Sequence, residues 1–177
     1  MLTFEMCNQL LNLAKEYEPK LKEQVIRVFK GNEFKCIAIR RPLQDTRFKI
    51  EISDNKNDGS YHYYNIGTWL KEKYNLCEAG YMMKDFHNIF SFLHEVGHVI
   101  GEYTLGYDAK QYEELKLREF ISSQESFEAY RNIPTEAYAD KFAVEVINKY
   151  IEDIYIIAKE FTTIEEIKQE IAFWNCL

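Results

Sequence analysis

Residues 90–102 of this 177-residue chain read FSFLHEVGHVIGE, a stretch built around the pattern His-Glu-x-x-His. If the segment is helical, His94 and His98 lie one turn apart on the same face. That spacing allows two imidazole nitrogens to reach one Zn²⁺ at bonds of roughly 2.0–2.1 Å. Glu95 lies about a quarter-turn away, where its carboxylate could accept a proton from a metal-bound water. The stretch therefore predicts a helix that carries a metal site.

Helical periodicity extends from Asp85 to Glu102. At about 100° per residue, more than half of the circumference is apolar, with Phe86, Ile89, Phe90, Phe92, Leu93, Val96, Val99 and Ile100 on it. The remaining sector holds His87, Ser91, His94, Glu95, His98 and Glu102. A surface helix would carry Lys and Glu there, so we expect a helix buried nearly all round, with its polar strip facing a cleft. Gly97 would allow another backbone to approach. His87 lies two turns before His94, too far along the axis to share its ion, and is expected to be a core or rim histidine.

A third metal ligand is expected further along the chain. The metzincin pattern requires His or Asp at position 104, where this chain has Thr104. Residues 132–143 offer a better candidate, because Pro134 suits the first turn of a helix. An apolar stripe at i, i+3, i+4 and i+7 follows it, made of Ala139, Phe142, Ala143, Val146, Ile147 and Tyr150. Glu136 falls inside this stripe, and a carboxylate buried there is costly unless it is paired or binds a metal. Glu136 is therefore the predicted third ligand.

Asp140 lies one turn after Glu136, at the edge of the same stripe. We expect its carboxylate to accept a hydrogen bond from the far N–H of a ligating histidine and so to fix the tautomer of that ring. Asp108 and Glu102 are the alternative third ligands. In the competing interpretation, Glu136 only decorates the start of its helix, where acids suit the helix dipole.

The motif HEVGH at residues 94–98, followed by Glu136-x-x-x-Asp140, resembles the gluzincin metallopeptidase pattern. The surrounding sequences FSFLHEVGH and EAYADKFA are similar to the ImmA/IrrE-type metallopeptidases of bacteria, phages and mobile elements. The resemblance covers roughly residues 80–150. It implies a zincin-like fold and a substrate that is a specific regulatory protein. It also implies zinc ligands and a general base, which would be His94, His98 and Glu136, with Glu95 as the base.

The composition indicates a single folded domain over residues 1–177, with 46% hydrophobic and 15% aromatic residues. The formal charge of −7 disfavours nonspecific binding to nucleic acid. The basic residues of the first third are expected to be solvated. The cysteines are scattered without a C-x-x-C pair, which indicates neither a disulfide scaffold nor a cysteine zinc site; they are Cys7, Cys36, Cys77 and Cys176. With no signal peptide apparent and no apolar run near the ~20 residues of a spanning helix, we expect a cytoplasmic protein that does not enter a membrane.

The remaining segments predict a mostly helical α+β protein with a small antiparallel sheet. Helices are expected at residues 3–17, 68–74, 109–120 and 122–131, at 151–161, and from a threonine cap at 162 or 163 to about 174. Residues 20–29 are ambiguous and are interpreted as helix. Alternating apolar residues predict strands at 34–40 and 47–52. After a turn at 54–59, residues 61–66 are the candidate third strand, with His62 exposed on it.

These patterns predict a zinc metallopeptidase that hydrolyses a protein or peptide substrate. Two alternatives belong to other classes of protein. One is a non-catalytic regulator that binds a metal on a gluzincin scaffold and acts by protein–protein interaction. The other is an interaction protein whose histidines are merely buried. The presence of Glu95 favours the enzyme, because metal binding alone does not require that carboxylate.

Overall fold

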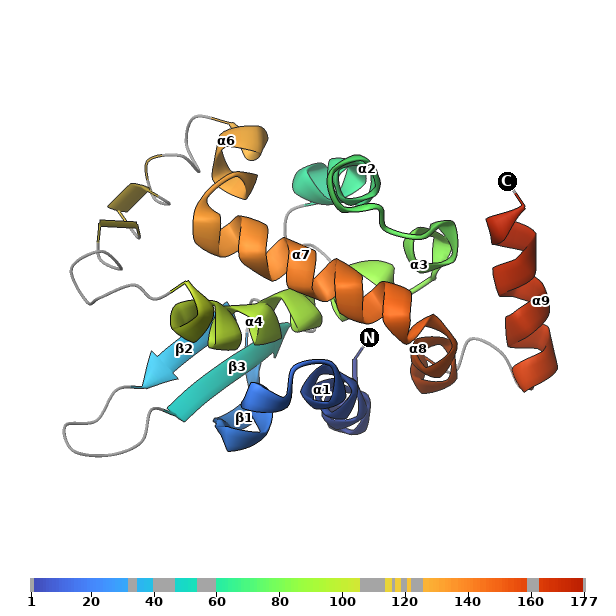
Figure 1. Ribbon diagram of the computed structural model, residues 1–177, viewed down its shortest axis with the longest axis horizontal. Coiled ribbons are helices and arrows are strands. Elements are labelled where there is room, and N and C mark those ends of the chain that lie inside the picture. Colours follow the sequence, from blue (N-terminus) through green and yellow to red (C-terminus); the bar gives the residue numbers. More distant parts are fainter. Residues whose placement is uncertain are drawn as a thin grey trace.

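The computed structural model describes residues 2–31, 35–39, 47–53, 60–105, 114–115, 117–118, 121, 126–158 and 163–176. Figure 1 shows the arrangement of the elements. In chain order the elements are α1 (Phe4–Tyr17), the 3-10 helix η1 (Pro19–Glu23), β1 (Val25–Gly31), β2 (Lys35–Ile39), β3 (Arg47–Ser53), α2 (Ser60–Tyr74), α3 (Glu78–Met82), α4 (Phe86–Thr104), α6 (Phe127–Arg131), α7 (Pro134–Lys149), α8 (Ile151–Ala158) and α9 (Ile164–Asn175).

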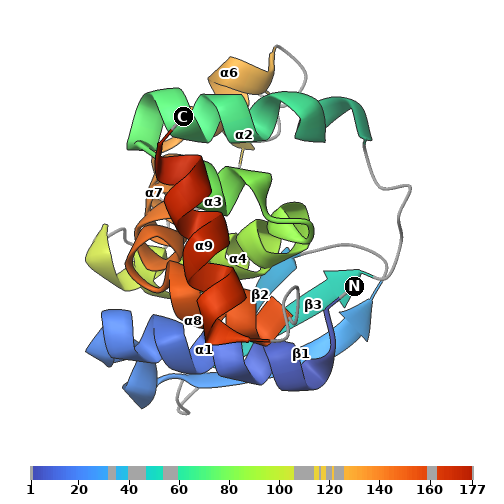
Figure 2. The ribbon, with the colours of Figure 1, turned by 90° about the vertical axis from the view of Figure 1, so that its right-hand side faces the viewer.

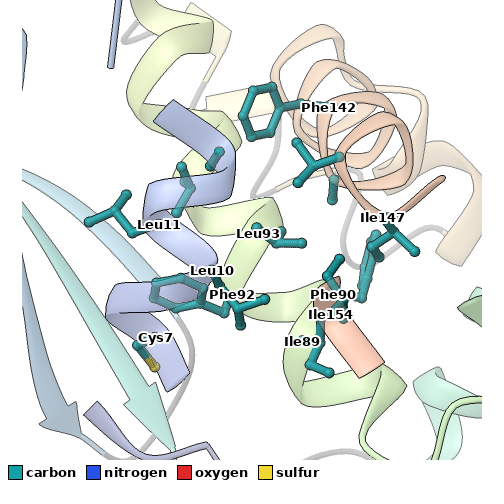
Figure 3. Packing of buried hydrophobic residues seen from close by; sticks show 14 of the residues in the cluster. Cys7, Leu10, Leu11, Ile89, Phe90, Phe92, Leu93, Phe142, Ile147 and Ile154 are labelled. Atoms are coloured by element: carbon teal, nitrogen blue, oxygen red, sulfur yellow. The ribbon is translucent and has the colours of Figure 1, made fainter. Parts of the chain in front are cut away.

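Helices α4 and α7 lie side by side and form the most extensive contact between described elements (Figure 1). All eight apolar residues predicted to surround α4 are buried, with exposed fractions of 3% or less. On α7 the predicted stripe is buried from Ala139 to Ile147. Side chains from α1, α4, α7 and α8 meet in one connected apolar cluster (Figure 3). The two periodic patterns therefore face each other and build the core.

The other elements are arranged in layers around this pair. In both ribbon views α2 and α6 lie on one side of α4 and α7, and α1 lies on the opposite side near the sheet (Figures 1 and 2). Helix α4 also contacts β2 and β3. On β3 the alternate residues Phe48, Ile50 and Ile52 are buried. This half-buried central strand gives α4 a second apolar surface to pack on.

The sheet has the order β1-β3-β2, so β3 is central. Strands β2 and β3 pair antiparallel, with Cys36 opposite Ile50, as the alternation in both segments predicted. Strand β1 pairs parallel with β3, with Ile26 opposite Phe48. The expectation of an antiparallel sheet is therefore wrong for this pair, and the sheet is mixed. The physical reason is the topology of the sheet. Strands β1 and β2 lie on opposite sides of β3, and the chain reverses direction twice between β1 and β3, so these two strands run in the same direction.

Two segments adopt a different structure from the one predicted. Residues 20–29 were expected to be helical, but after the short 3-10 helix the chain enters β1, where Val25, Ile26 and Val28 favour a strand. Residues 61–66 were expected to be a strand, but they lie in α2. Ile66 and Leu70, one helical turn apart, are both buried. The helical period of this segment outweighs the strand preference of its tyrosines.

The last helix begins as predicted. The Thr163 side chain accepts from the backbone N–H of Glu166, whose carboxylate in turn accepts from the Thr163 backbone N–H. Three cysteines of the described chain, Cys7, Cys77 and Cys176, are free thiols. Within the described residues no helix combines the length and apolar character that crossing a bilayer requires. Helix α6 confirms the later part of the helix expected at 122–131. Most of the helix expected at 109–120 and the turn expected at 54–59 fall outside the described residues.

Candidate metal centre

Helices α4 and α7 approach each other closely at Gly97. A Cβ atom placed there would be 2.9 Å from the Cα of Ala139 and 3.2 Å from its carbonyl oxygen. Both distances are shorter than ordinary contact, so only glycine fits between the two backbones. This confirms the predicted backbone approach at Gly97. The contact falls between His94 and His98 on one helix and beside Asp140 on the other.

The structure brings His94, His98 and Glu136 together between the two helices. Each residue offers one nitrogen or oxygen atom, and these atoms lie within 4.8 Å of one another. The Nε2 atom of His94 is 3.1 Å from Nε2 of His98 and 3.2 Å from Oε2 of Glu136. The Nε2 atom of His98 is 3.3 Å from Oε1 of Glu136. His94 and Glu136 are buried, whereas the His98 side chain is 23% exposed and opens the group to solvent.

Asp140 lies on the other side of the His94 ring. Its Oδ1 atom is 2.9 Å from Nδ1 of His94, and the Asp140 side chain is completely buried. Because a carboxylate only accepts, Nδ1 of His94 must carry the donated hydrogen. In the neutral ring this leaves the lone pair on Nε2, the atom that faces His98 and Glu136. The orientation expected for a metal-binding histidine is therefore built into the structure.

The cluster of His94, His98, Glu136 and Asp140 favours positive charge on His94. Burial by itself would lower the pKa of His94, but its hydrogen bond to Asp140 and its contact with Glu136 outweigh burial and raise that pKa to about 10. Burial by itself would raise the pKa of Glu136, but contacts with the two histidines hold it well below its usual range. A cation placed among these atoms would meet a carboxylate and two aligned nitrogens.

The donor set fits Zn²⁺. Tetrahedral coordination at bonds of roughly 2.0–2.1 Å holds neighbouring ligand atoms about 3.3 Å apart, and the contacts within this group are 3.1, 3.2 and 3.3 Å. The buried Oε2 atom of Glu136 has no hydrogen-bond donor in suitable geometry among the described residues. Two imidazoles and one carboxylate are the ligands of many catalytic zinc sites. His94, His98 and Glu136 are therefore the residues that could hold the ion.

Glu95 follows His94 on α4 and is 9% exposed. The part of the chain that the structure describes provides no hydrogen-bond or ion-pair partner for its carboxylate. His87 lies outside the three-residue group and is exposed in the first turn of α4, next to the buried Phe86, which agrees with a rim position. The alternative ligand Asp108 and the side chains of Glu102 and His62 are outside the described residues.

Sequence reasoning missed Arg131, the last residue of α6. Its Nη1 atom donates to Oδ1 of Asp140 at 2.8 Å and lies 3.8 Å from Oε2 of Glu136. The available signal was the buried Asp140 itself, because a buried carboxylate needs a positive partner. The partner could not be chosen from the sequence, because the turn between α6 and α7 decides which basic residue folds back onto α7.

Comparisons of the chain with models of known protein families, with curated proteins and with solved structures find no match. The chemistry of the site is therefore inferred from its own residues.

Proposed function

We propose that this protein is a zinc-dependent metallopeptidase that hydrolyses a peptide bond in a protein substrate. The observation that carries the proposal is the convergence of His94, His98 and Glu136 at 3.1–3.3 Å. The buried Asp140 behind His94 adds support, because carboxylates in that position are typical of zinc-binding histidines. The partial exposure of His98 supports a catalytic role, since a substrate must reach the ion.

A bound Zn²⁺ would polarise the scissile carbonyl and lower the pKa of a water molecule in its open coordination position. The residues of the chain then have separate tasks. His94, His98 and Glu136 hold the ion, and Asp140 keeps the His94 ring in position. Glu95 accepts a proton from the attacking water and returns it to the nitrogen of the leaving amine.

The sheet offers a place for an extended substrate. Strand β2 lies at the edge of the described sheet and contacts α4, the helix that carries both histidines. A peptide in extended conformation could add to such an edge through main-chain hydrogen bonds. The resemblance to the ImmA/IrrE-type enzymes favours a regulatory protein as the substrate.

The test compares wild-type protein with Glu95→Gln and with Glu152→Gln as the control, because Glu152 is an exposed glutamate on α8. Each is loaded with zinc, analysed for metal content, and incubated with a peptide library read by mass spectrometry. We expect one zinc per chain in all three, cleavage by the wild type and by Glu152→Gln, and none by Glu95→Gln. Undiminished cleavage by Glu95→Gln would contradict its role as the base. Stoichiometric zinc without cleavage in the wild type would favour the non-catalytic regulator, and absence of zinc would favour an interaction protein with buried histidines.

A further inference from the structure

Arg131 joins the metal centre from outside the two helices that form it. Its Nη1 atom donates to the same Asp140 oxygen that His94 Nδ1 contacts, at 2.8 Å and 2.9 Å respectively. Its guanidinium group lies over the rings of Phe127 and Tyr130, with 5.7 and 5.4 Å between the guanidinium carbon and the ring centroids. These contacts hold the arginine in one orientation.

Asp140 depends on this arginine for its position. Its side chain is completely buried, and both donors it meets bind Oδ1, while Oδ2 has no hydrogen-bond partner among the described residues. Without Arg131, only the His94 ring would restrain the carboxylate. The ring would then lose its fixed support in turn, since each of the two groups orients the other. Arg131 therefore acts on the histidine through the aspartate.

We propose that Arg131 is a positioning residue of the metal centre: through Asp140 it fixes the His94 ring so that Nε2 faces His98 and Glu136. This inference rests on the proposed metal site and does not depend on peptidase activity. A simpler electrostatic effect of Arg131 would change metal affinity in the opposite direction. Arg131 is a cation 3.8 Å from a predicted metal ligand, so its charge alone would repel the ion, and removing it would strengthen metal binding. The direction of the change in affinity decides between the two effects.

The experiment measures zinc affinity by competition with a chelator and records the visible spectrum of the Co²⁺-loaded protein, which reports coordination geometry. The variants are Arg131→Met, which keeps an apolar stem without charge, and Arg131→Lys, which keeps the charge without the planar fork. Lys149→Met is the matched control. It removes a cation that lies over Tyr17 and Tyr150 at the far end of α7, 5.4 and 5.2 Å from their ring centroids.

We expect Arg131→Met to weaken zinc affinity roughly tenfold, the lower end of the range for residues that orient metal ligands, and to change the Co²⁺ spectrum. Arg131→Lys should fall between Arg131→Met and the wild type, and Lys149→Met should match the wild type. In an Asp140→Asn background, Arg131→Met should change the affinity less than about twofold, because the arginine acts through that carboxylate.

Unchanged or tighter zinc binding by Arg131→Met would overturn the proposal, and so would an equal loss in both backgrounds. If Arg131→Met does not fold, Arg131→Lys decides, and wild-type affinity with a wild-type Co²⁺ spectrum would overturn the proposal. A wild-type protein that binds no zinc would overturn the metal site itself. If the wild type binds zinc and Arg131→Met leaves the zinc affinity unchanged, only the role of Arg131 is overturned.

Discussion

Gly97→Ala should separate α4 from α7 and weaken metal binding at the proposed centre. A Cβ atom at this position would lie 2.9 Å from the Cα of Ala139 and 3.2 Å from its oxygen. These are backbone atoms and cannot rotate away, so the helices must move apart by roughly 0.5–1 Å to restore carbon contacts of about 3.5–4.0 Å. Overpacking of this kind costs about 3 kcal/mol at the upper end of its usual range, and alanine returns about 1 kcal/mol of helix propensity.

The net loss of stability is therefore about 2 kcal/mol, which corresponds to a fall in Tm of about 4–8 °C for a chain of this size. Zinc affinity should fall by about tenfold or more, because the proposed ligands lie on both helices. Gly101→Ala is the control, since the three described atoms nearest its added Cβ all belong to the Tyr138 ring, at 3.2 Å and beyond, and the ring can shift. Urea denaturation and chelator competition measure the two quantities. Equal behaviour of the two variants would refute the reasoning.

Three further predictions concern single groups. Burial lowers the pKa of His94, but its two carboxylate neighbours outweigh burial and raise that pKa to about 10. Zinc binding at pH 7 should therefore release a proton from His94. Zinc affinity should rise about tenfold per pH unit as the pH approaches 10. Calorimetry in buffers of different ionisation enthalpy detects the proton, and a pH-independent affinity would contradict this. Tyr155→Phe should cost about 1–2 kcal/mol of unfolding free energy, because the buried hydroxyl donates to the Ala79 carbonyl oxygen at 2.9 Å. Thr163→Ala should cost about 1 kcal/mol by removing an N-cap, seen as faster amide exchange at the start of α9 with little change elsewhere.

Both central helices could be predicted from the sequence because their apolar period extends over several turns. Nineteen residues of α4 and sixteen of α7 leave little freedom over which face is buried. Glu136 and Asp140 were noticed for the same reason, since each breaks an otherwise apolar stripe. A buried charge in a periodic helix is a local signal, and it was readable without knowledge of the fold.

The sheet could be predicted only in part because its pairing depends on distant segments. The antiparallel pair β2 and β3 follows from alternation within each strand. The parallel pair requires β1 to lie on the far side of β3, and nothing within Val25–Gly31 specifies that neighbour. Val25 and Phe29 are both 41% exposed. Because apolar residues of this edge strand face solvent, its sequence does not show the alternation of buried apolar and exposed polar residues by which a strand is recognised.

The contact between α4 and α7 contributes both to the core and to the proposed metal centre. Val96, Val99 and Ile100 of α4 are buried in the apolar cluster, while His94 and His98 leave the same helix towards Glu136. The separation of the candidate ligand atoms is therefore set by helix packing, which the apolar residues stabilise. This differs from small zinc domains, whose folding depends on the metal. Because the proposed ligands are held by the core, substitutions that alter the spacing of α4 and α7 should change metal affinity even when they contact none of these three residues.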